Sequence, residues 1–273
     1  MADEEIYRAI VAAQEAGEAV ALATVIRTRG AVPRRAGSRM LVYPDGRILG
    51  TVGGGGIEQR AISDAHAAIE DGQTRVNAYS LVDPDSGDVG ICGGTSEIFI
   101  EPLLPDPIVL VIGCGHVGKA VAALAKWVGF RVAVSDDRAE FCTPDIIPDA
   151  DIYLPVAPDA LAQHIVINRQ TYIAALTRGV DVDVELLPAL LESPAPYIGL
   201  IGSRRRWSMT VQGLQARGVT PEQIARVRSP IGLELNAETP REIAVSIMAE
   251  IIMVMHGGTG AVMKITPSAP REG

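Results

Sequence analysis

The 273-residue sequence has few aromatic side chains and no excess of positive charge. Phe, Trp and Tyr together make up 4% of the residues, so a hydrophobic core must consist mainly of Val, Ile, Leu and Ala. The formal net charge is −9, and the only dense basic run is Arg204–Arg206. Because proteins that bind nucleic acid normally present a basic face to the phosphate backbone, the charge argues against nucleic acid as a partner.

Long apolar runs and a cysteine framework are also missing. The longest apolar candidate, Ile243–Met255, contains a glutamate and falls short of the roughly 18 residues that span a bilayer. The acidic start, Met1–Glu5, lacks a signal-peptide core. The three cysteines, Cys92, Cys114 and Cys142, show no disulfide spacing. We therefore expect a reduced, cytoplasmic protein with no membrane insertion.

A cluster of prolines divides the chain. Three prolines within residues 102–107 remove backbone donors and disfavour regular structure. We place the domain boundary there, with an N-terminal domain at residues 1–104, a C-terminal domain at 105–256 and a tail at 257–273.

The N-terminal part is expected to be a small α+β domain. Apolar residues spaced three or four apart predict a first helix that ends at Gly17. In Pro44–Gly46 the proline fixes φ and the glycine accepts positive φ, so the flanking strands should form a hairpin. The other elements are strands at Ala19–Ile26, Arg39–Tyr43, Arg47–Val52, Arg75–Leu81 and Thr95–Leu103 and a helix at Ile57–Asp71.

The C-terminal part alternates strands with helices, which is typical of a parallel sheet. Ile108–Ile112 is a continuous apolar run, as expected for a strand that is buried on both faces. Pro240–Met255 begins with a capping box and predicts a helix. Further strands are expected at Arg131–Ser135, Ile152–Val156, Tyr172–Leu176 and Tyr197–Ile201. The fold class is therefore α/β, with a Rossmann-like domain after a smaller α+β domain.

Gly113, Gly115 and Gly118 form a GxGxxG sequence between the first C-terminal strand and a helix. In this context the glycines allow a tight turn, a close approach of a pyrophosphate and close packing of helix on strand. Asp136 lies 23 residues after Gly113, near the usual offset of a carboxylate that binds ribose hydroxyls, and Asp137 is the alternative. NAD(P), FAD or another dinucleotide would fit, and a turn that only packs the strand against the helix remains open.

Two further residues could contact a ligand held at this turn. His116 opens the following helix, where it could contact the ligand or donate a proton, and a satisfied polar residue at the helix terminus is the alternative. Arg204 follows a strand and an expected N-cap, so it could reach an anionic ligand at the carboxyl edge of the sheet. A solvated arginine is the alternative.

A second glycine site is expected in the N-terminal part. Gly53, Gly54 and Gly55 precede a helix, where consecutive glycines can form an anion-binding nest. Arg34 would add a planar guanidinium for an oxyanion. The alternative is a flexible loop with a solvated arginine.

Cys92 is followed by two glycines, which would expose its sulfur. A thiolate is a soft metal ligand or a nucleophile when its pKa is lowered, whereas a buried cysteine acts as a small hydrophobe. Cys114 and Cys142 are expected to be structural, and the spacings CxxC, HxH and HExxH are absent.

In these motifs and their order the sequence resembles the XdhC/CoxI family, which comprises accessory proteins of molybdenum hydroxylases such as xanthine dehydrogenase. The resemblance extends over most of the chain. The matching stretches are Gly30–Glu58, Ile91–Pro102, Val109–Gly118, Phe130–Arg138, Tyr197–Arg206 and Pro230–Glu250.

The resemblance implies a chaperone rather than an enzyme. Such a protein would bind the molybdenum cofactor (molybdopterin or its dinucleotide form), assist its sulfuration with a cysteine desulfurase and help to insert it into an apo molybdenum hydroxylase. By analogy it would be a homodimer. Arg34, Gly53–Gly55 and Cys92 would contact the pterin and the metal, whereas Gly113, Gly115, Gly118 and Asp136 would hold a nucleotide.

Three positions depart from the family pattern. Ala31 replaces a serine, Gly56 stands where many members have a cysteine, and Val180 replaces the histidine of a TRGHxxD segment. A role for a thiol in the Gly53–Gly56 loop is therefore excluded, which leaves Cys92 as the expected metal or sulfur contact.

Two other functions remain open on the residues alone. The first is an NAD(P)-dependent oxidoreductase, in which Asp136 would favour NAD and His116 would be the only nearby group for proton transfer. The second is a nucleotide or redox sensor that binds without turnover.

Overall fold

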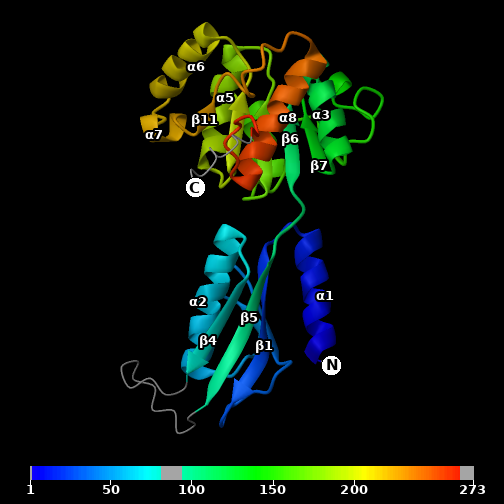
Figure 1. Ribbon diagram of the computed structural model, residues 1–273. Coiled ribbons are helices and arrows are strands. Elements are labelled where there is room, and N and C mark those ends of the chain that lie inside the picture. The colour runs from blue at the N-terminus through cyan, green and yellow to red at the C-terminus, as the bar shows by residue number, and fades with distance from the viewer. Residues whose placement is uncertain (1, 81–93, 265–273) are drawn as a thin grey trace, which may run out of the picture. The chain divides into compact units, whose positions relative to one another are not determined.

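The computed structural model describes residues 2–80 and 94–264. The chain divides into two compact units, Met1–Asp106 and Pro107–Gly273, which are shown in Figure 1. The α/β class expected from the sequence is confirmed, because a mixed α+β unit precedes a parallel sheet flanked by helices.

The N-terminal unit is a five-stranded antiparallel sheet with the order β3-β2-β1-β5-β4. One helix covers each face of this sheet, because alternate residues of β1 belong to different core clusters: Ala21 and Ala23 pack with α2, whereas Val20 and Leu22 pack with α1. The elements are α1 (Ala2–Glu15), β1 (Val20–Arg29), β2 (Arg39–Val42), β3 (Ile48–Gly50), α2 (Gly55–Asp71), β4 (Arg75–Ser80) and β5 (Thr95–Leu103).

One local expectation, the start of a helix, needs correction in this unit, whereas the strand expected at Thr95–Leu103 has the predicted bounds. Helix α2 begins at Gly55, inside the glycine run rather than at Ile57. Pro102 lies within β5 and pairs with Ala21 of β1. The sheet tolerates this proline because the pairing of β5 with β4 ends at Ile100, so no strand on that side needs its missing N–H.

The C-terminal unit is a six-stranded parallel sheet with the order β11-β10-β9-β6-β7-β8. Counted from β6, this is the Rossmann order 3-2-1-4-5-6. Its strands are β6 (Ile108–Ile112), β7 (Arg131–Ser135), β8 (Ile152–Leu154), β9 (Thr171–Ala175), β10 (Tyr197–Leu200) and β11 (Val227–Arg228). The two-residue strand β11 has too short an apolar pattern for the sequence to predict it.

Helices cover both faces of this sheet (Figure 1). Val109 and Val111 of β6 face the cluster that contains α3 and α8, whereas Leu110 faces the cluster that contains α5 and α6. The helices are α3 (His116–Val128), α4 (Leu161–His164), α5 (Val180–Glu192), α6 (Arg204–Ala216), α7 (Pro221–Ile224) and α8 (Pro240–His256). No helix in the described ranges is long and apolar enough to cross a membrane.

The strand order reverses between β6 and β9, which lie side by side at the centre of the sheet. In open α/β sheets, ligands bind outside the carboxyl ends of the strands at such a reversal. The turn after β6 is the glycine sequence, so the topology and the motif indicate the same place.

Candidate functional site

Gly113, Gly115 and Gly118 have different structural roles. Gly113 has φ = +109°, and a Cβ there would clash with the carbonyl of Leu176 at the end of β9. A Cβ at Gly118 would clash with the Gly113 carbonyl, so this glycine is needed for packing of α3 on the turn. At Gly115, by contrast, a Cβ would meet no atom within 4 Å. The open space is therefore at the position where a pyrophosphate would approach.

The start of α3 is available to an anion. Its N-cap is Gly115, and no side chain caps the helix there. The first N–H groups of a helix have no intrahelical partner, and the helix dipole makes this end partially positive. This combination is typical of a phosphate-binding helix start.

Asp136, the expected ribose ligand, is almost fully buried and is engaged by the protein itself. Its carboxylate accepts hydrogen bonds from the Cys114 N–H at 2.9 Å and from the Arg138 guanidinium at 2.9 Å. Burial opposes ionisation, but the bonds from Arg138 and from the backbone outweigh it and hold the pKa of Asp136 below its usual value. Asp136 therefore fixes the glycine turn and holds Arg138 beside it.

Asp137 makes a second carboxylate–guanidinium pair at the same edge. Arg178, three residues after β9, donates from both terminal nitrogens to the two Asp137 oxygens, at 2.5 and 2.7 Å. The hydrogen bond from Arg178 lowers the pKa of Asp137. Arg138 is thus held after the carboxyl end of β7 and Arg178 after that of β9, and these two strands flank β6.

These groups line a cavity of about 130 Å³. It is open at the carboxyl ends of β6, β7, β8 and β9, as the reversal of strand order predicts. The main lining residues are Gly113, Gly115, Ser135, Asp136, Asp137, Arg138, Val156, Pro158, Thr177 and Arg178. Typical ligand sites measure roughly 300–1,000 Å³, so this cavity has room for one end of a nucleotide rather than for a whole dinucleotide.

A buried polar network supports the loop that carries Arg178. Arg206 of α6 donates to both oxygens of Asp183, at 2.7 and 2.9 Å, and to the hydroxyl and carbonyl of Thr177. Asp183 has no solvent exposure and also accepts from the hydroxyls of Thr177 and Thr210. The network therefore joins the end of β9 to α5 and α6 directly behind the cavity.

Replacing Asp136 by asparagine tests how firmly the turn is held. We expect the free energy of unfolding to fall by about 1.5–3 kcal/mol at neutral pH, the usual contribution of hydrogen bonds to a charged group. Because the folded-state pKa is lowered, this contribution is complete above the unfolded pKa of about 3.9 and disappears as pH falls through the folded pKa. Urea unfolding over a pH series measures it. A gap between wild type and Asp136→Asn that stays constant into strong acid would contradict this role.

Two of the predicted residues lie away from this cavity. His116 is exposed and lines a groove between α3 and α8 instead. Arg204 is exposed at the start of α6, and the arginine of this run that reaches inward is Arg206. A ligand contact by His116 or Arg204 therefore stays a prediction.

Cys114 and Cys142 are both buried free cysteines. Their sulfurs donate to the carbonyls of the adjacent residues Ser135 and Val134, at 3.6 and 3.3 Å. Contact with Cys142 and burial both raise the pKa of Cys114, so its sulfur is a protonated thiol. The contact between Cys114 and Cys142 could not be predicted, because the two cysteines are 28 positions apart and meet only in the fold. Cys92 lies outside the described residues.

The second glycine site is assembled within the N-terminal unit. Gly53, Gly54 and Gly55 all have positive φ, and a Cβ at Gly53 would lie 3.3 Å from Pro33, next to the exposed Arg34. Gly94 packs so closely that a Cβ there would clash with the carbonyl of Ala31. The loop of Arg34, the start of α2 and the chain segment that follows Cys92 thus converge in this unit.

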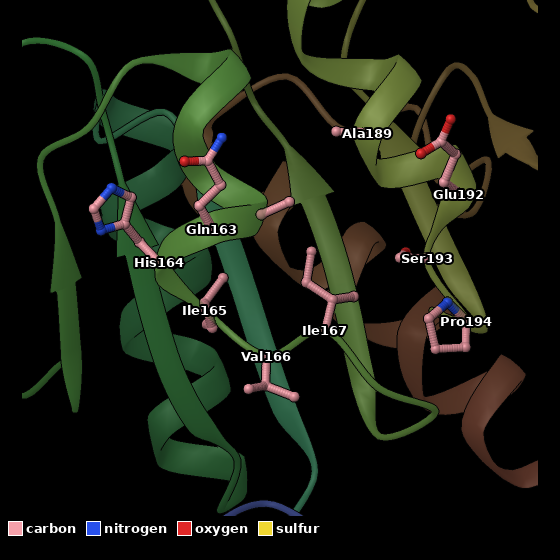
Figure 2. Close-up of a pocket in the computed structure, with 10 residues that line it drawn as sticks. Gln163, His164, Ile165, Val166, Ile167, Ala189, Glu192, Ser193 and Pro194 are labelled. Carbon is pink, nitrogen blue, oxygen red and sulfur yellow. The ribbon is translucent and has the colours of Figure 1, made fainter.

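A cavity of about 440 Å³ lies near the amino ends of β9 and β10, the edge opposite the glycine turn. In Figure 2, His164 and Glu192 lie on opposite sides, with the side chains of Ile165, Val166 and Ile167 between them. No set of polar groups converges there. Within residues 2–80 and 94–264, no cluster of His, Cys, Asp or Glu side chains could hold a metal ion.

Arg138 and Arg178 are site residues that sequence reasoning did not select. Arg138 and Arg178 occur in the stretches that resemble the family, Phe130–Arg138 and the TRG segment, so a signal was present. Their pairing with Asp136 and Asp137 was not visible, because it depends on how the loops after β7 and β9 meet.

Comparison with known proteins gives consistent matches in both units. Residues 109–251 match the family model described as the XdhC Rossmann domain, and residues 13–80 match that of the XdhC and CoxI family. The chain is 34% identical over 252 residues to the uncharacterized protein YqeB of Escherichia coli K12, covering 92% of this chain and 46% of YqeB. It therefore spans about half the length of that relative.

Two further similarities concern a chaperone and a solved structure. The chain is 26% identical over 281 residues to the molybdenum cofactor insertion chaperone PaoD of Escherichia coli K12, covering 91% of this chain and 87% of PaoD. The crystal structure of a xanthine dehydrogenase from Bacillus halodurans matches with a TM-score of 0.50 and 22% identity, over 99% of this chain and 98% of that one, and shows the fold alone. Since the Rossmann-domain model covers more than half of the sequence, the chain belongs to the XdhC and CoxI family.

Proposed function

We propose that this protein binds the molybdenum cofactor as cargo and helps to insert it into an apo molybdenum hydroxylase of the xanthine dehydrogenase or carbon monoxide dehydrogenase type. The observation that carries the proposal is the uncapped glycine turn, with open space at Gly115, in a chain related to the insertion chaperone PaoD. The cargo carries the molybdenum chemistry, and the residues of this chain bind and orient it.

The C-terminal unit would hold the phosphate-bearing end of the cargo. The N–H groups at the start of α3 suit a phosphate or pyrophosphate, and Arg138 and Arg178 supply guanidinium groups at the rim. The cavity of about 130 Å³ would accept phosphate and ribose and leave the larger pterin end outside. This favours a ligand with a nucleotide end.

The N-terminal unit would contribute a contact for an oxyanion or for the pterin. Gly53–Gly55 and Arg34 are the candidates, because the glycines adopt positive φ at the N-terminus of α2 and Arg34 is exposed in the neighbouring loop. We further propose that Cys92 contacts the metal or receives sulfur during sulfuration with a cysteine desulfurase, since it lies two residues before Gly94 in this unit.

Retention of released cofactor tests the proposal. Cofactor freed from a hydroxylase is mixed anaerobically with the purified protein, and molybdenum is measured in the protein fraction after size exclusion. We expect wild type to retain molybdenum, Arg34→Ala and Cys92→Ser to retain less, and Arg35→Ala, the exposed neighbour, to behave as wild type. No retention by wild type would reject the cargo proposal. Equal retention by Cys92→Ser would reject only the role of Cys92.

A further inference from the structure

An apolar groove of about 880 Å³ runs between α3 and α8, which lie side by side in Figure 1. Ala120, Leu124 and Trp127 of α3 form one wall, and Ala244 and Val245 of α8 form the other. Trp127 is 83% exposed and Val245 is 51% exposed. A tryptophan that borders an open apolar groove is typical of a protein interaction surface.

The charge of the groove limits what can bind there. Its ionisable lining residues are Lys119, Arg241 and His116, and none of the described residues that line it is acidic. The whole chain carries a net charge of −9, so this is a local cationic surface. Pairing of the groove with its own copy would oppose cation to cation, which is unfavourable. The occupant must therefore be acidic as well as apolar.

Helix α1 presents such a surface. Ile6 and Ala13 pack on the sheet, whereas Tyr7 and Val11 on another face are 51% and 56% exposed. Acidic Asp3, Glu4 and Glu15 line the same shallow hollow as Tyr7 and Val11, with Arg8 as its single cation. Glu4 pairs with Arg8 and Asp3 with the half-buried Arg39, and ion pairs with a solvent-exposed carboxylate contribute little in water and can be exchanged for others.

We propose that α1 of a second copy of this chain binds in the α3–α8 groove. The spacing of charged and apolar groups matches: Asp3 precedes Val11 by eight residues, as Lys119 precedes Trp127, and each interval is about 12 Å along a helix. A parallel alignment places Asp3 opposite Lys119 and Val11 opposite Trp127. This is the helix-in-groove mode of recognition, with the chain itself as partner.

The proposal does not depend on the cargo. Reciprocal exchange of α1 between two copies gives a closed dimer, whereas a contact in one direction gives longer chains. His116 belongs both to the groove and to the first turn after Gly115, so the bound helix lies at the edge of the glycine turn.

Sedimentation velocity over a concentration series tests the contact. We expect wild type to self-associate, more weakly at high salt because exposed charges are screened. Trp127→Ala should raise the dissociation constant at least about 10-fold, as for a central tryptophan of an interface. The matched control is Val166→Ala, since Val166 is 69% exposed in the cavity of Figure 2, at the amino edge of the sheet.

A charge exchange identifies the occupant. Lys119→Glu and Asp3→Lys should each weaken association, and the double variant should recover most of it, because the ion pair is re-formed with opposite polarity. A wild type that stays monomeric would overturn the proposal. So would association that Trp127→Ala leaves unchanged, or a double variant no better than the single ones.

Discussion

Replacing Arg206 by methionine should lower the free energy of unfolding by about 3–5 kcal/mol, the usual cost of breaking a buried ion pair by removing one partner. Arg206 donates two hydrogen bonds to Asp183, which has no solvent exposure, and two more to Thr177. Without the guanidinium, the Asp183 charge stays buried with only hydroxyl partners. Urea unfolding at neutral pH measures the loss.

Arg205→Met is the matched control, because Arg205 is the exposed neighbour in the first turn of α6 and its loss should change stability by no more than about 0.5 kcal/mol. Adding Asp183→Asn to Arg206→Met should recover part of the loss, since no uncompensated charge then remains. A loss below about 1 kcal/mol for Arg206→Met would show that Asp183 is not held by this pair.

The architecture could be predicted because its signals are local and repeated. The continuous apolar run Ile108–Ile112 indicates a strand buried on both faces, and all five of its residues are buried. The strand expected at Tyr172–Leu176 is also present and lies one residue earlier, at Thr171–Ala175. The capping box of α8 fixes where that helix begins, and both of its hydrogen bonds are formed. Pattern and structure agree wherever a short stretch of sequence determines its own conformation.

Predictions failed where a neighbouring element decides the outcome. Strand β11 has only two residues and exists because β10 provides its hydrogen-bonding partner. Such effects depend on the register of other strands, which the sequence does not display.

In the candidate site, too, the locally determined features could be predicted and the long-range ones could not. The glycine turn could be located from its motif, since each glycine has a local reason to lack a side chain or to face open space. The partners of the charged residues could not be predicted: a ribose contact by Asp136 stays a prediction, and its hydrogen bonds from Arg138 and from the backbone of the turn appear only in the structure. Pairing across loops from different strands is a long-range property.

Replacing Gly115 by aspartate should separate folding from ligand binding. The side chain would enter open space at an N-cap with extended backbone, where aspartate is among the preferred residues, so stability should be kept or raised. The same carboxylate would accept the N–H groups that a phosphate needs and would repel its charge. We expect the affinity for a nucleoside diphosphate to fall at least about 100-fold, or about 2.7 kcal/mol, measured by calorimetry.

Gly115→Asn is the matched control, since it has the same shape and capping ability without the charge. It should lose less affinity than Gly115→Asp, and the difference measures the electrostatic part of phosphate binding. Gly113→Ala should instead lose stability, because φ = +109° and the nearby Leu176 carbonyl leave no room for a Cβ. Wild-type affinity in Gly115→Asp would mean that the glycines only pack α3 against β6 and that the anion binds elsewhere.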